Sequence, residues 1–178
     1  MENSVIIAGF GGQGVILAGK ILAQAGMEHG LEVTWLPSYG PEMRGGTANC
    51  TVVISEEAIG SPIVDEPSAL IALNLPSLDK FEPKVKKNGV IIVNSSLISR
   101  RLNRDDVNSF SLDLNAMAAD LGNTKAINTL SIGAYIKATG FLPLARVQEA
   151  MERMLRQGGK EKFIPINKQA IEQGYNAV

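Results

Sequence analysis

The sequence predicts a doubly wound α/β domain: one three-layer unit with a mostly parallel sheet and a glycine-rich turn between its first strand and first helix. Two observations predict this class. Strand-like apolar runs alternate along the chain with segments of helical periodicity, which is the pattern of parallel strands joined by helices. The 178 residues suffice for one core, and no internal repeat or linker divides residues 1–178 into two domains.

The first predicted unit is a strand over residues 4–8, a turn of glycines and a helix that ends near His29. Small and apolar residues fill this helix, and its one polar stripe consists of Lys20, Gln24 and Glu28, spaced four apart. Such a helix is packed on most of its sides. The lone histidine lies at the helix end, where the helix dipole favours a cation, so we interpret it as structural.

The next two predicted strands flank a loop. Residues 31–36 form a run that ends at Pro37, and residues 47–54 alternate between apolar and polar, as half-buried strands do. The alternation buries Cys50, the sole cysteine, which lacks the partners that a disulfide, a zinc site or an iron–sulfur cluster requires. Between the strands, residues 38–46 are so rich in glycine and proline that no regular structure is predicted.

The later elements continue the alternation. Continuous apolar runs over residues 70–73 and 90–93 are typical of strands that helices cover on both faces, and a further strand is expected at 110–112. Helical periodicity is found in four segments, residues 116–121, 126–138, 144–155 and 168–173. The last segment is predicted to be a short helix after a break at Gly158-Gly159.

Composition and charge exclude several classes of protein. Hydrophobic residues make up 45% of the chain and charged residues 20%, as in ordinary soluble proteins. A net charge of −1 provides no overall field for nucleic acid or an anionic membrane. No apolar run approaches the ~20 residues that span a bilayer, and the first four residues lack the basic start of a secretion signal. We expect a cytoplasmic protein with no nucleic-acid or membrane partner.

The glycine-rich turn is the first candidate site. It reads Gly-Phe-Gly-Gly-Gln-Gly, which matches G-x-G-x-x-G between a strand and a helix, where free N–H groups and the helix dipole favour a phosphate. The alternative is that these glycines only allow close packing of strand and helix. The second strand lacks the terminal acidic residue that binds a nicotinamide ribose, which disfavours an ordinary NAD(P) site. The candidate phosphate contacts are Gly9, Gly11, Gly12, Gln13 and Gly14.

The loop over residues 38–46 is the second candidate site. Loops after strand ends border the crevice where open α/β sheets bind ligands or partners. Tyrosine and arginine are favoured at interfaces, and an arginine can bind a carboxylate through two hydrogen bonds. The alternative is a solvated turn, which is less expected of a loop of this length. The interface candidates are Ser38, Tyr39, Pro41, Glu42, Arg44 and Gly45.

Catalytic patterns are absent from the sequence. It has no nucleophile elbow, no paired metal-binding histidines and no P-loop lysine after the glycine turn. We interpret Arg100, Arg101 and Arg104 as a solvated face, with a site for an acidic partner as the alternative. Asn74 and Asn94 close two strands, where they either form turns or line a site.

Two segments together resemble a known family. They are Ile-Ile-Ala-Gly-Phe-Gly-Gly-Gln-Gly-Val at residues 6–15 and Leu-Pro-Ser-Tyr-Gly-Pro-Glu-Met-Arg-Gly-Gly at residues 36–46. The chain resembles the gamma subunit of 2-oxoacid:ferredoxin oxidoreductases, of the 2-oxoglutarate or 2-oxoisovalerate type. The similarity covers almost the whole chain, including Thr-Ala-Asn-Cys-Thr at 47–51 and Leu-Pro-Ser-Leu-Asp at 75–79.

The resemblance implies an accessory subunit with no catalytic residue, metal or cofactor of its own. It implies alpha and beta subunits, with a delta subunit in some members, that hold thiamine diphosphate, magnesium and 4Fe-4S clusters. The assembly decarboxylates a 2-oxoacid, with 2-oxoglutarate favoured and 2-oxoisovalerate next, forms an acyl-CoA and reduces ferredoxin. The loop at 38–46 would dock on the catalytic subunits near the thiamine site, and the glycine turn would contact a phosphate of CoA or only pack. The alternatives are a stand-alone nucleotide- or CoA-binding module and a structural adaptor.

Overall fold

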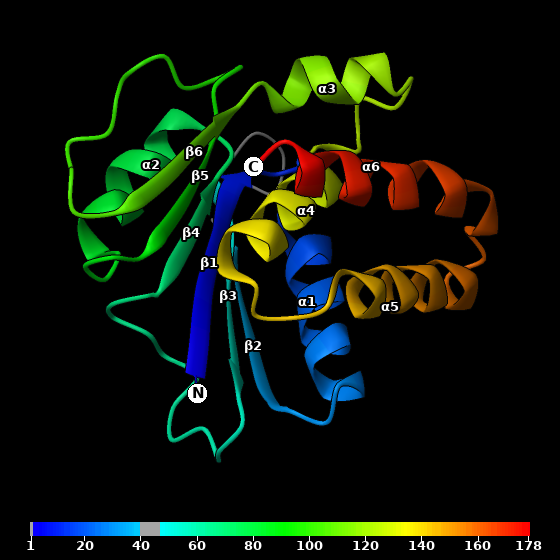
Figure 1. Ribbon diagram of the computed structural model, residues 1–178, viewed down its shortest axis with the longest axis horizontal. Coiled ribbons are helices and arrows are strands. Elements are labelled where there is room, and N and C mark those ends of the chain that lie inside the picture. The colour runs from blue at the N-terminus through cyan, green and yellow to red at the C-terminus, as the bar shows by residue number, and fades with distance from the viewer. Residues whose placement is uncertain (1, 40–46) are drawn as a thin grey trace.

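The computed structural model describes residues 2–39 and 47–178, which form one mixed sheet with helices on both faces (Figure 1). The strand order is β2-β3-β1-β4-β5-β6. Strand β3 is antiparallel to both of its neighbours, whereas the pairings from β1 to β6 are parallel. The predicted α/β fold with a mostly parallel sheet is confirmed. The strands are β1 (Glu2–Phe10), β2 (Glu32–Tyr39), β3 (Thr47–Ser55), β4 (Ala69–Ala72), β5 (Val90–Asn94) and β6 (Asn108–Leu112).

More helices pack on one face of the sheet than on the other (Figure 1). Helix α2 packs on one face, while α1, α4, α5 and α6 gather on the other. No helix in the described ranges is long and apolar enough to cross a membrane. The α-helices are α1 (Val15–Glu28), α2 (Leu75–Phe81), α3 (Leu114–Asp120), α4 (Ile127–Thr139), α5 (Leu144–Gln157) and α6 (Ile164–Asn176), with 3-10 turns η1 (Glu82–Lys84) and η2 (Glu161–Phe163).

Two hydrophobic cores lie on opposite faces of the sheet. Along β1, Val5 and Ile7 face the larger core under α1 and α4, whereas Ile6 and Ala8 face the smaller core under α2. Because both faces are covered, the strand is apolar at successive positions instead of alternating. This explains the continuous run from which the strand is predicted.

Strand β2 extends beyond its predicted end. Pro37 lies inside the strand, and Ser38 and Tyr39 continue it, so the expectation that these two residues begin an irregular loop is wrong. β2 is an edge strand, where a proline without an N–H group costs no ladder hydrogen bond on the open side. The rest of the predicted loop, including Pro41, Glu42, Arg44 and Gly45, lies outside the described residues.

The last helix is also longer than the predicted segment at 168–173. Pro165 occupies its first turn, where a missing N–H group is tolerated. Helix α6 crosses α4 at two glycines: a Cβ at Gly133 would overlap the carbonyl oxygen of Ile171, and one at Gly174 would overlap that of Leu130. The backbones therefore touch, and α6 is an integral part of the larger core.

Candidate functional site

The carboxyl ends of β1, β2, β4, β5 and β6 lie at one edge of the sheet, called here the carboxyl edge. Phe10 at the end of β1 pairs with Thr47, and Tyr39 at the end of β2 pairs with Ala48. The glycine turn follows Phe10, and the predicted interface loop connects Tyr39 to Thr47. The structure thus brings the starting points of the two predicted sites to neighbouring positions on the carboxyl edge.

The glycine turn leads into α1 without a side-chain cap. Gly12 and Gly14 have φ values of +96° and +76°, which only glycine adopts without strain. Gly14 is the N-cap of α1, and its first turn carries no acidic residue. A Cβ at Gly12 would meet no atom within 4 Å, so the turn is open on this side. The uncapped N–H groups and the positive end of the helix dipole favour an anion here.

Gln13 has a role that the motif did not predict. Its Oε1 accepts a hydrogen bond from the N–H of Phe10 at 2.6 Å, and its Nε2 donates to the carbonyl oxygen of Leu73 at 3.3 Å. A Cβ at Gly9 would overlap Gln13 Oε1, so glycine is needed there for packing. These contacts favour a packing role for Gly9 and Gln13. Phosphate contacts at Gly11, Gly12 and Gly14 remain predictions.

Two asparagines hold the neighbouring strand ends. Asn74 caps α2 by accepting a hydrogen bond from the N–H of Ser77 at 2.9 Å. Asn94 donates to the carbonyl oxygen of Leu73 at 3.3 Å and to Oδ1 of Asn115 at 3.0 Å. Of the alternatives for Asn74 and Asn94, these contacts favour the structural one. The amide Nδ2 of Asn74 is buried and has no partner among the described residues.

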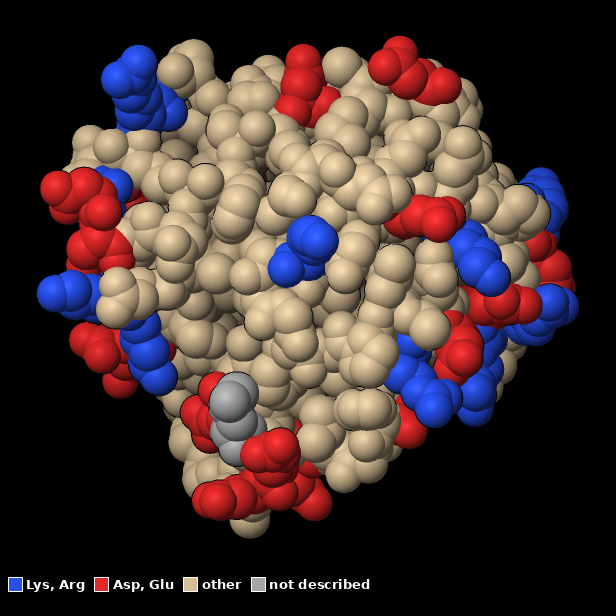
Figure 2. All heavy atoms as spheres, in the orientation of Figure 1, with Lys and Arg blue, Asp and Glu red and all other residues tan. Residues whose placement is uncertain are grey.

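Large apolar side chains are exposed along the carboxyl edge. Tyr39 is 58% exposed and Leu97, which follows β5, is 44% exposed. Phe10 and Leu75, after β1 and β4, are also exposed. Gathered apolar side chains on a protein surface mark sites of interaction with other molecules. Figure 2 shows another face of the molecule, on which most charged side chains lie toward the rim and one Lys or Arg side chain lies near the centre.

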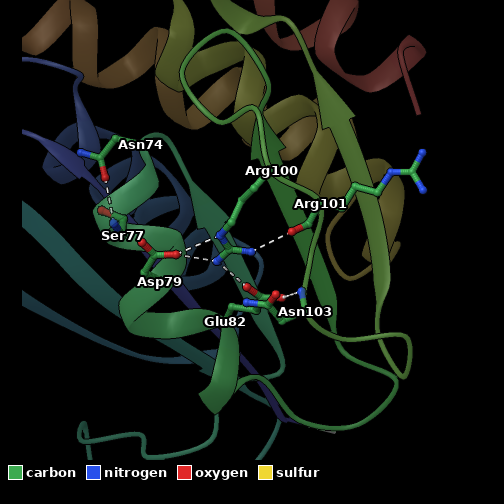
Figure 3. Close-up of polar contacts among 7 residues, drawn as sticks. All are labelled: Asn74, Ser77, Asp79, Glu82, Arg100, Arg101 and Asn103. Atoms are coloured by element: carbon green, nitrogen blue, oxygen red, sulfur yellow. Dashed lines mark hydrogen bonds and ion pairs between the residues drawn. The ribbon is translucent and has the colours of Figure 1, made fainter.

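Arg100 lies in an ion-pair cluster at the end of α2, with 26% of its side chain exposed (Figure 3). Its guanidinium binds Asp79 at 2.6 Å and Glu82 at 2.7 Å. The Glu82 carboxylate is almost fully buried and also accepts the backbone N–H of Asn103 at 2.5 Å. Arg100 is thus both partly exposed and paired with two carboxylates of its own chain, and the interpretation of the three arginines as a solvated face stays a prediction. The cluster ties the segment after β5, which carries Leu97, to α2.

Cys50 and His29 lie where the sequence predicts. Cys50 is 0% exposed, and its Sγ donates to the carbonyl oxygen of Val15 at 3.4 Å. Burial raises the pKa of this thiol to about 12, which makes it unsuited to nucleophilic chemistry. His29 is the C-cap residue of α1. Within residues 2–39 and 47–178, no group of three or more His, Cys, Asp or Glu side chains is placed to hold a metal ion.

The family model described as "Pyruvate ferredoxin/flavodoxin oxidoreductase" matches residues 4–177. The chain belongs to this family. This confirms the family resemblance carried by the glycine turn and the residues from 36 to 46. The family match spans both hydrophobic cores and the carboxyl edge.

Relatives within the family differ in length. The chain is 41% identical over 173 residues to the ketoisovalerate oxidoreductase subunit VorA of Methanothermobacter thermautotrophicus, which covers 97% of this chain but only 36% of that protein. It is 35% identical over 171 residues to the 2-oxoglutarate synthase subunit KorC of Methanothermobacter marburgensis, with 92% of each protein covered. The chain thus spans about a third of VorA and nearly all of KorC.

A solved structure has the same fold. The crystal structure of the keto/oxoacid ferredoxin oxidoreductase gamma subunit from Geobacter sulfurreducens superposes with a TM-score of 0.82 and 29% sequence identity. The superposition covers 98% of this chain and 97% of that one. The chain therefore shares its fold with this gamma subunit over nearly its whole length.

Proposed function

We propose that this chain is the accessory gamma subunit of a thiamine-dependent 2-oxoacid:ferredoxin oxidoreductase. The enzyme would oxidatively decarboxylate a 2-oxoacid, form an acyl-CoA and reduce ferredoxin. The observation that carries the proposal is the match over nearly the whole chain to KorC, a separate subunit of similar length. The gamma-subunit structure from Geobacter supports it. Relatives named for 2-oxoglutarate and for ketoisovalerate make these two 2-oxoacids the substrates to test.

In this proposal the cofactors belong to other subunits. The alpha and beta subunits, with a delta subunit where the enzyme has one, hold thiamine diphosphate, magnesium and 4Fe-4S clusters. The gamma chain binds to these subunits and has no catalytic residue. Ferredoxin contacts the assembly through the cluster-bearing subunits, and the assembly works in the cytoplasm.

The carboxyl edge is the proposed docking surface for the catalytic subunits. Its exposed apolar side chains, Phe10, Tyr39, Leu75 and Leu97, suit a contact that excludes water. The chain leaves the sheet at Tyr39 and returns at Thr47, so the connecting residues start and end on this edge. The proposed contacts of that segment are Ser38, Tyr39, Pro41, Glu42, Arg44 and Gly45.

The glycine turn is proposed to contact a phosphate of CoA when CoA reaches the thiamine site. The residues present fit a phosphate group, because α1 begins without a side-chain cap and Gly12 borders open space. The contacts would come from backbone N–H groups at Gly11, Gly12 and Gly14. Gln13 would hold the turn in shape through its bonds to Phe10 and Leu73.

Affinity purification of the tagged full chain from its native cells, without oxygen, tests the assignment. We expect thiamine- and cluster-binding subunits to co-purify, with iron and thiamine diphosphate in the eluate. The complex should reduce ferredoxin with CoA and either 2-oxoglutarate or 2-oxoisovalerate, and the ratio of the two rates identifies the substrate. Recovery of the chain alone, free of iron and thiamine, would refute the assignment.

A further inference from the structure

A cavity of about 610 Å³ lies among the helices on one face of the sheet. It is bordered by the glycine turn and α1, by the start of α4, by the end of α5 and by the turn into α6; these four helices lie together in Figure 1. A volume of this size suits a small organic molecule. Leu17 and Phe163, two of the large apolar side chains that the domain exposes, both line this cavity.

The lining combines an apolar wall with an uncompensated positive charge. Ile21, Met151 and Met154 form part of the wall, and methionine side chains adapt to the shape of what they contact. Lys125 and Lys160 are exposed residues of the lining. Neither lysine forms an ion pair within the described part of the chain, and the cavity lining contains no Asp or Glu. The charge therefore has no partner inside the protein.

The backbone adds to this positive potential. Helices α1, α4 and α6 all begin without a side-chain cap, and each contributes to the lining near its start, through Gly14, Asn128 and Asn167. Each helix start carries a partial positive charge. Asn128 donates to the carbonyl oxygen of Gly14 at 3.3 Å, and Thr129 donates to Asn167 Oδ1 at 3.1 Å. These bonds hold the three helix starts around the cavity.

We propose that this cavity binds an organic carboxylate with an apolar body, the carboxylate lying between Lys125 and Lys160 and the body lying against Ile21, Met151 and Met154. The lining contains no carboxylate for ribose hydroxyls, so a sugar is not the body that this cavity suits. We therefore expect the part of the ligand that contacts the cavity wall to be apolar and not a sugar. Gly12 and Gly14, which are proposed above to contact a phosphate of CoA, also border the cavity, so a carboxylate bound here would compete with that phosphate. The inference does not depend on the subunit assignment, since every lining residue comes from this chain.

Calorimetric titration of the full chain with octanoate tests the proposal. We expect one saturable site, a dissociation constant at least about tenfold higher for the Lys125→Gln/Lys160→Gln double variant, and weaker binding of octanol than of octanoate. Leu17→Glu places a like charge at an exposed position of the lining and should abolish binding while the circular dichroism spectrum is unchanged. The matched controls are Lys84→Gln/Lys86→Gln and Met27→Glu, whose residues lie outside this cavity.

Three results would overturn the proposal. The first is the absence of saturable octanoate binding to the native chain. The second is an affinity that the lysine and Leu17 variants leave unchanged, which would place the ligand elsewhere. The third is octanol binding as tightly as octanoate, which would show that the carboxylate makes no contact with the lysines.

Discussion

The side chain of Gln13 donates a hydrogen bond to the carbonyl oxygen of Leu73 at 3.3 Å, across 60 residues of sequence. The same side chain accepts the N–H of Phe10 at 2.6 Å. One amide thus closes the glycine turn and attaches it to the end of β4. The turn is held in one shape before any ligand arrives, which lowers the conformational entropy that binding must overcome.

Replacing Gln13 with alanine should loosen this turn. We expect Gln13→Ala to lower the free energy of unfolding by about 1–2 kcal/mol, because two hydrogen bonds are lost in a partly buried site. In the assembled enzyme the KM for CoA should rise. Urea unfolding and CoA titration check both effects. Gln24→Ala, which removes a side-chain contact with Glu28 within α1, should leave the KM for CoA unchanged.

Gly12 and Gly30 form a matched pair for testing the proposed phosphate contact. Both have positive φ, and a Cβ at either would meet nothing within 4 Å, so alanine costs a similar backbone strain of about 1 kcal/mol at each. Only Gly12 lies in the turn. CoA affinity of the complex should fall for Gly12→Ala and remain unchanged for Gly30→Ala; equal affinities for the two variants would leave the glycines a packing role alone.

Arg44 and Tyr39 test the docking surface. Arg44→Ala and Tyr39→Ala should each weaken assembly, measured as complex mass and turnover, without unfolding the free chain. Tyr39 is exposed, so its truncation costs the free domain little. Ile63→Ala is the control, since Ile63 is 69% exposed on the segment joining β3 to β4 at the opposite edge. Unchanged mass and turnover for both variants would remove this segment from the interface.

Cys50 should be inert toward thiol reagents in the folded chain. Its pKa of about 12 keeps the thiol protonated at pH 8, where the reactive thiolate is a small fraction, and the reactive fraction increases only as pH rises toward that value. We expect labelling by iodoacetamide at pH 8 to be negligible in buffer and complete in 6 M guanidinium. Mass spectrometry of the chain measures the extent of labelling. Rapid labelling of the folded protein would show that the strand opens.

The crossing of α4 and α6 should tolerate no side chain at its two glycines. Gly133→Ala and Gly174→Ala each force a methyl group onto a backbone carbonyl, and we expect each to destabilise the domain by about 3 kcal/mol. Gly158→Ala is the control, because a Cβ there makes an ordinary contact at 3.4 Å and should change stability by less than about 0.5 kcal/mol. Thermal unfolding of the three variants gives the comparison.

Sequence patterns predicted most elements correctly and missed those that depend on their surroundings. The strand over residues 4–8 and the helix ending near His29 are marked by local apolar periods and appear as predicted. Helix α2 is missing from the sequence prediction because its second residue is Pro76, which local patterns favour at a break; the Asn74 cap and the packing of Leu78 stabilise the helix. Local sequence predicts a strand end at Pro37, since nothing local reveals that β2 lies at the sheet edge.

The sequence by itself determined the alternation of strands and helices, the buried position of Cys50 and the family, because these depend on local composition and on contiguous motifs. Only the tertiary structure decided which distant residues meet. It joined Gln13 to Leu73, paired Arg100 with Glu82 and brought Lys125 and Lys160 to the lining of one cavity. Such contacts depend on the order of strands and on the packing of helices, which local periodicity does not encode.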